Sequence, residues 1–232
     1  MQILAIDAST ELCAVALGGS DGFVERSAIA GQRHSELLLP MIAAALGDAG
    51  IAVGALDGIA FGSGPGSFTG LRIACGVAQG LALGAGLPLI GVPTLAAMAE
   101  AMRMRDGDRR VIAALDARMR EVYLAAYEYD GTSWRSDVAP VVVKPEEAPM
   151  PTGSNWVGAG AGFGAYSALR ERLGSVLLRC DMTIVPTASA VGTLALPGFA
   201  AGAGVAARDA APLYVRHRVA LTSAERAAGT IL

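Results

Sequence analysis

The sequence is poor in histidine and cysteine, two residue types that often bind transition metals. Its 232 residues include two histidines, His34 and His217, and three cysteines, Cys13, Cys75 and Cys180. The cysteines form no C-x-x-C pair and their number is odd, which is typical of reduced, buried thiols in a cytosolic protein. Because a zinc site needs three or four ligands, we predict no metal site.

Charge is also scarce in this chain. Charged residues make up 17% and the net charge is −3, which argues against a protein that binds nucleic acid by bulk charge alone. Apolar residues make up 53%, so the chain has ample material for a core and disorder is not expected. The length fits either one large α/β domain or two lobes of about 100 residues each.

The sequence lacks a clear membrane span or signal peptide, although its mean hydropathy of +0.47 is high. The most apolar stretch, residues 71–95, contains Arg72 and Pro88, which interrupt a spanning helix. Near the N-terminus, Asp7 and Glu11 break the apolar run, and no basic region precedes it. We therefore predict a cytoplasmic protein without membrane contact.

Hydrophobic spacing predicts the element order βββαβαβ for the first hundred residues. The expected strands are residues 2–7, 13–17, 23–29, 57–61 and 87–92, and the expected helices are residues 35–49 and 69–84. Further along, strands are expected at 111–115, 122–129 and 156–158, and helices at 165–173 and 188–203. Helices that cross between later strands indicate an α/β fold with a mixed sheet.

A weak internal repeat indicates two lobes of related design. Residues 3–8 read ILAIDA and residues 112–117 read IAALDA; each is an apolar strand that ends in Asp-Ala before a polar turn and a return strand. The charged stretch 103–110 reads as a linker. We therefore place the first lobe at residues 1–104 and a smaller second lobe, with a loosely held tail, at residues 105–232.

Two segments of the first lobe carry residues that are suited to phosphate binding. Asp7, Ser9 and Thr10 follow the first strand, where hydroxyls and amides can hold a phosphate and the carboxylate a hydrated metal. A glycine-rich loop then precedes the second helix, whose free amides attract anions; its candidate residues are Gly64, Gly66, Ser67, Thr69 and Gly70. The alternatives are an ordinary turn and a helix cap, and the loop is neither a P-loop nor a Rossmann fingerprint.

Three glycines recur every four residues along the second helix. Gly76, Gly80 and Gly84 therefore share one face, which lets another backbone approach closely. Each interior glycine costs about 0.5–1 kcal/mol relative to alanine, so a contact should compensate for it. Two interpretations remain open: packing of the helix on its own sheet, and packing against a helix of a partner subunit.

Several motifs together indicate a known family. The most specific is Gly64–Arg72, which reads GPGSFTGLR. The others are Ile3–Leu17, Arg33–Pro40 (RHSELLLP), Leu115–Arg118 with Glu121–Tyr123, and Pro212–Arg216 (PLYVR). In order and over nearly the whole chain, these motifs resemble the bacterial TsaB (YeaZ) family, although residues 130–210 match only loosely.

The resemblance implies an ASKHA (actin/Hsp70-like) fold of two ribonuclease-H-like lobes with mixed sheets. It also implies a non-catalytic scaffold or activator subunit in tRNA N6-threonylcarbamoyladenosine synthesis, with a TsaD-like catalytic partner and a TsaE-like ATPase. TsaD-like chains carry a His-rich metal motif where this chain reads Pro93–Glu100, without histidine. The chain should therefore bind no cofactor alone, although ATP or ADP could lie at the complex interface, and it should meet tRNA only within the complex.

The resemblance further implies that the two first-lobe helices form a dimer surface, either with the partner subunit or with a second copy when the chain is alone. The expected contact residues are His34, Ser35, Leu38, Met41, Ile42, Ala45, Arg72, Gly76, Gly80 and Gly84. Whether Arg118 and Arg120 touch tRNA stays open. The main alternative is a stand-alone ASKHA-type ATPase or kinase that uses Asp7, Ser9, Thr10 and residues 64–70. The scarcity of histidine argues against a metallopeptidase.

Overall fold

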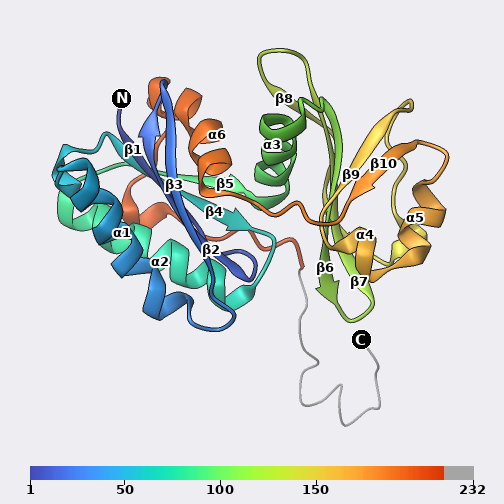
Figure 1. Cartoon of the computed structure of the whole chain (residues 1–232), viewed down its shortest axis with the longest axis horizontal. Coiled ribbons are helices and arrows are strands. Elements are labelled where there is room, and N and C mark those ends of the chain that lie inside the picture. The colour runs from blue at the N-terminus through green and yellow to red at the C-terminus, as the bar shows by residue number, and fades with distance from the viewer. Residues whose placement is uncertain (217–232) are drawn as a thin grey trace, which may run out of the picture.

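The computed structural model describes residues 1–216 and contains two five-stranded mixed sheets, each packed against helices (Figure 1). In the first unit the strand order is β3-β2-β1-β4-β5. Its strands are β1 (Ile3–Asp7), β2 (Leu12–Gly19), β3 (Gly22–Ile29), β4 (Gly58–Gly64) and β5 (Leu89–Pro93). Its helices are α1 (His34–Ala49), α2 (Phe68–Ala85) and α6 (Ala188–Ala200), and α3 (Thr94–Asp106) stands between the two sheets.

The second unit repeats the design of the first. Its strands are β6 (Arg110–Arg118), β7 (Glu121–Tyr129), β8 (Trp134–Val143), β9 (Trp156–Ala159) and β10 (Leu177–Asp181), with the short helices α4 (Gly162–Ala165) and α5 (Ser167–Leu173). The order β8-β7-β6-β9-β10 matches that of the first sheet strand for strand, with the same directions. The ILAIDA and IAALDA segments fall on the equivalent strands β1 and β6, which confirms the internal repeat.

The central strand β1 is buried along its whole length because helices cover both faces of its sheet. Leu4 and Ile6 lie in a core cluster with residues of α1 and α2, while Ile3 and Ala5 lie in a second cluster with residues of α6. A strand that is covered on both sides carries apolar residues in sequence rather than alternating ones. This explains why the short run ILAI forms a strand at the centre of the unit.

The predicted linker at residues 103–110 is wrong. Helix α3 runs through Asp106, and Arg103 donates to the buried carboxylate of Glu100 within it (2.6 Å). Leu95, Met98 and Met102 repeat every three or four residues and are fully buried, so the helical pattern continues into the charged stretch. Only residues 107–109 connect α3 to β6.

The predicted lobe boundary also needs correction, because the chain returns to the first unit after β10. Helix α6 packs against β1, β2 and β4, where Ala188, Val191 and Ala195 are fully buried. Residues 210–216, which we call the C-terminal strap, then run along the first unit to the β6–β7 turn (Figure 1). The first unit is therefore built from two distant parts of the sequence. The rest of the predicted tail, residues 217–232, lies outside the described residues.

Candidate functional site

Asp7 lies at the end of β1 and is fully buried. Its Oδ1 accepts hydrogen bonds from the Ser9 amide (3.0 Å) and the Ser9 hydroxyl (2.9 Å). Burial raises the pKa of Asp7 to about 7, and the two Ser9 hydrogen bonds only partly oppose this shift. The carboxylate that was considered for metal or phosphate binding is thus bonded within its own turn.

The glycine-rich loop between β4 and α2 packs directly on the β1–β2 turn. The Ser67 amide donates to the carbonyl oxygen of Ser9 (2.7 Å), and the Ser67 hydroxyl caps α2 by accepting from the Gly70 amide (3.3 Å). A Cβ atom at Gly66 would lie 2.3 Å from the Ser9 oxygen, and one at Gly70 would lie 1.9 Å from the Ala8 oxygen. These two glycines are therefore explained by the close approach of two backbone segments.

The C-terminal strap covers the other side of this loop. The Leu213 amide donates to the Ser63 carbonyl (2.8 Å), and the Leu213 oxygen lies against Gly64. The fold does bring together the residues that the sequence suggested for phosphate binding, namely Asp7, Ser9, Thr10, Gly64, Gly66, Ser67, Thr69 and Gly70. Most of them bind or contact one another, while Thr69 is exposed, so these contacts favour the alternative of a packed turn and helix cap.

Four of the predicted partner-contact residues lie inside the first unit, which corrects their assignment. Leu38, Ile42 and Ala45 are buried in its core cluster. His34 is also buried, and its Nε2 donates to the Thr10 carbonyl (2.9 Å). The apolar spacing of α1 reflects its packing on the sheet. Met41 is half-buried, and Ser35 and Arg72 are exposed.

The glycine face of α2 points to solvent and away from the sheet. A Cβ atom at Gly76, Gly80 or Gly84 would meet no heavy atom within 4 Å among the described residues, apart from the helix's own backbone. Packing of these glycines on the chain's own sheet is therefore excluded. Leu83, which sequence reasoning missed, projects from the same region with 77% of its surface exposed.

The opposite face of α2 belongs to the core, although its length and composition alone would let it span a membrane. Ala74, Ala78 and Ala82 are buried against the sheet, and a core helix of this kind passes the same test. Within residues 1–216 no three His, Cys, Asp or Glu side chains are placed to hold a metal ion. His217 lies outside the described part of the chain.

Comparison with known proteins places the chain in a family. The family model of TsaD, described as tRNA N6-adenosine threonylcarbamoyltransferase, matches residues 24–224. The tRNA threonylcarbamoyladenosine biosynthesis protein TsaB of Escherichia coli is 41% identical over 95% of this chain and 96% of its own length. The protein of the same name from Haemophilus influenzae is 35% identical over 94% of this chain and 95% of its own length.

A solved structure agrees with these relatives. YeaZ from Pseudomonas aeruginosa superposes with a TM-score of 0.86 at 39% identity, covering 92% of this chain and 99% of its own. Both the sequence relatives and the solved structure therefore match this chain over nearly their full length. The chain belongs to the TsaB (YeaZ) family.

Proposed function

We propose that the chain is an accessory subunit in tRNA N6-threonylcarbamoyladenosine synthesis that binds a TsaD-like catalytic subunit through the exposed face of α2. The names of its relatives support the pathway. The observation that carries the interface is the solvent-facing row of Gly76, Gly80 and Gly84. At about 0.5–1 kcal/mol each, these glycines cost the isolated chain stability that no internal contact returns. A closely approaching helix of a partner compensates for this cost.

The residues beside the glycine row fit such a contact. The row carries no side chains, so a neighbouring backbone can approach the helix closely, and the exposed Leu83 supplies an apolar anchor next to it. Ser35 and Arg72 are exposed on α1 and α2 and remain proposed rim contacts. The same bare face would let two copies of this chain pair when no catalytic subunit is present.

We further propose that the chain itself is not the catalyst. Asp7 and Ser9 are bonded to each other, and the glycine loop is packed between the β1–β2 turn and the strap. The segment Pro93–Glu100 has no histidine. The matching strand orders of the two sheets support an ASKHA fold with two ribonuclease-H-like lobes that has lost its catalytic groups. A TsaE-like ATPase, a nucleotide at the complex interface and a cytoplasmic location are parts of the same proposal.

The substitution Gly80→Ala should have opposite effects on the free chain and on the complex. The new methyl group meets nothing within the described residues, so the free chain should gain about 0.5–1 kcal/mol and its Tm should rise by about 1–4 °C. In the complex the same methyl group would keep the partner's backbone from approaching the helix, which should weaken binding of the TsaD-like subunit by about 10-fold or more. Thermal unfolding and calorimetric titration measure the two effects.

A charge at the same position gives a stronger test. Gly80→Asp should abolish co-purification with the TsaD-like subunit, whereas Ser136→Asp, which places the same charge on exposed β8, should not. A Gly80→Asp protein that is folded and still binds its partner with wild-type affinity would disprove the interface.

The isolated chain should bind Mg-ATP weakly or not at all and release no phosphate, because its candidate phosphate-binding groups are already bonded internally. In a reconstituted tRNA modification assay, omission of the chain should abolish or strongly reduce the modification. Robust ATP turnover by the chain alone would instead favour the ATPase alternative.

A further inference from the structure

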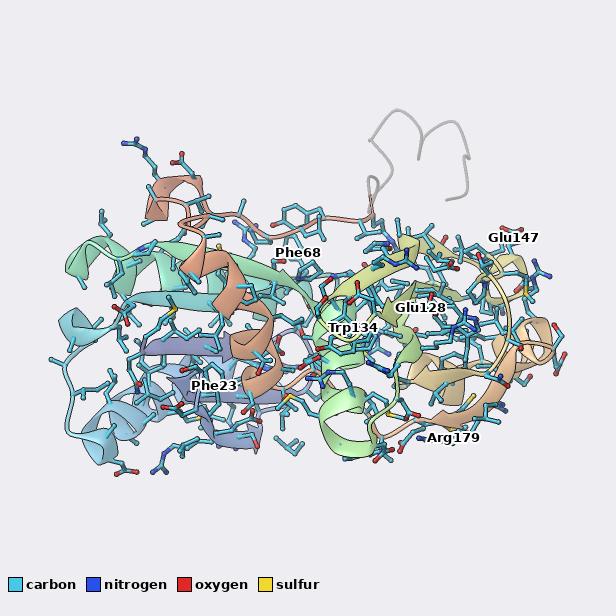
Figure 2. The ribbon with its side chains drawn as sticks, turned by 90° about the horizontal axis from the view of Figure 1, so that it is seen from above. Phe23, Phe68, Glu128, Trp134, Glu147 and Arg179 are labelled. Carbon is cyan, nitrogen blue, oxygen red and sulfur yellow. The ribbon has the colours of Figure 1, made fainter. Side chains whose placement is uncertain are left out.

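The exposed aromatic side chains of this protein are gathered at one place. Its two Trp, five Tyr and five Phe all lie within residues 1–216, and only Phe68 and Tyr214 are exposed, by 56% and 51%. Phe68 begins α2 and Tyr214 belongs to the C-terminal strap, yet their ring centroids lie 5.9 Å apart. Figure 2 shows Phe68 beside the strap. The other aromatic side chains are buried or half-buried, so this exposed pair is unusual within the chain.

Arginines flank the aromatic pair on both sides. On α2 the Arg72 guanidinium lies over the Phe68 ring, 5.3 Å from its centroid. On the other side Arg216, two residues after Tyr214, ties the strap to the β6–β7 turn by donating to the Ala117 carbonyl (3.0 Å). The turn that follows Ala117 exposes two further arginines, Arg118 and Arg120.

The β6–β7 turn holds its arginines in an unfavourable backbone conformation. Arg118, Met119 and Arg120 have φ angles of 62°, 54° and 61°, which are uncommon for residues other than glycine. Such conformations cost about 1–3 kcal/mol each and persist only where neighbouring contacts enforce them. Here Asp116 accepts from the Arg118 amide (2.8 Å), and Arg216 contacts the Met119 sulfur (3.1 Å).

The charges of this region are predominantly positive and accessible. Among residues 1–216, Arg72 and Arg120 form no ion pair, and Arg118 pairs only with Asp116 while its side chain stays 84% exposed. Glu121, which begins β7, is paired with Arg216. A local excess of guanidinium groups in a chain of net charge −3 favours an anionic ligand at this site.

We propose that Phe68, Arg118, Arg120 and Tyr214, which we call the arginine–aromatic surface, bind single-stranded RNA within the assembled complex, beside the rim contact already proposed for Arg72. Exposed aromatic rings stack on unpaired bases, and arginines bind phosphates or stack beside them. This inference rests on the proposed function, because the RNA is then a single-stranded part of the tRNA substrate. The small number of charges fits a secondary contact that operates together with the catalytic subunit rather than alone.

The test uses the complex of the full chain with its TsaD-like subunit and an unmodified tRNA transcript as the probe. Replacing both Phe68 and Tyr214 with alanine should weaken tRNA binding by about 5- to 150-fold, since the stacking of one base on an aromatic side chain contributes about 1–3 kcal/mol. Phe68→Trp, which keeps a stacking ring, should retain wild-type affinity. Arg118→Asn with Arg120→Asn removes two charges, and asparagine tolerates the left-handed backbone. The slope of the logarithm of the tRNA binding constant against the logarithm of the salt concentration should then fall in magnitude by about 1.4.

The control is Arg135→Gln, which removes an exposed charge from the far end of the β7–β8 hairpin and should leave tRNA binding unchanged. Unchanged tRNA affinity in the aromatic and arginine variants would overturn the proposal. Loss of binding to the TsaD-like subunit in those variants would also overturn it, by making this surface a protein contact. A failure of the proposed function looks different, because the wild-type chain would then form no complex with the TsaD-like subunit or have no effect on tRNA modification.

Discussion

Replacing Gly70 with alanine should destabilise the protein by about 3 kcal/mol or more, measured as the free energy of unfolding in urea. A Cβ atom at this position would lie 1.9 Å from the carbonyl oxygen of Ala8, far inside the contact distance. The obstacle is backbone rather than a flexible side chain, so relief requires that α2 or the β1–β2 turn move. Because both segments are joined to buried strands, such a movement disrupts the core.

Two other glycines of the same region give this prediction its controls. Gly66→Ala should also be strongly destabilising, since its Cβ would lie 2.3 Å from the Ser9 oxygen. Gly76→Ala, on the solvent face of the same helix, should instead stabilise the free chain slightly. If the free energy of unfolding of Gly70→Ala lies within about 1 kcal/mol of the wild-type value, the close packing of loop and turn described above is incorrect.

The substitution Asp7→Asn should remove a large pH dependence from the stability of the protein. Because burial raises the pKa of Asp7 from 3.8 to about 7, the folded state holds the proton more tightly than the unfolded state does. The contribution of Asp7 to stability is therefore full below about pH 4 and is lost as the pH rises through about 7. The total loss is about 4 kcal/mol, from a shift of about three pKa units.

The prediction concerns the difference between wild type and Asp7→Asn, because other carboxylates act in the opposite direction. Hydrogen bonds to Thr183 and Arg105, for example, lower the pKa of Asp181, so that this group adds stability as the pH rises. In urea unfolding at about pH 4.5 and pH 8, the free energy of unfolding of Asp7→Asn should increase relative to that of the wild type at the higher pH. Asp21→Asn, in the exposed β2–β3 turn, is the matched control. A difference that does not change with pH would refute the buried, protonated state of Asp7.

The sequence predicted the first five strands and the helices α1 and α2 well, because their signals are local. The short apolar runs, the glycine-rich loop and the Asp-Ala pairs near the ends of β1 and β6 can all be read within short windows. The strand β10 was missed, since its residues LLRCD show no clear alternation of apolar and polar side chains. Helix α3 was missed because its charged last turn resembles a linker.

The candidate site was harder to predict, because its chemistry depends on contacts between distant residues. The spacing of Leu38, Ile42 and Ala45 shows an apolar face on α1, but it cannot tell whether that face meets the sheet or a partner. Gly70 and Gly80 look alike in the sequence; one touches a backbone oxygen some sixty residues away, and the other faces solvent. The pairing of Phe68 with Tyr214 likewise appears only when the strap is folded back.

The return of α6 to the first sheet has a consequence for how the protein is made. When β5 leaves the ribosome, one face of the first sheet still lacks the helix that covers it, and α6 follows about 100 residues later. At a synthesis rate of roughly 5–20 residues per second, the apolar side chains of that face stay uncovered for on the order of 5–20 s before α6 is made. The nascent chain is therefore a natural client for a chaperone during this interval, and a release after residue 104 would leave it without a complete fold.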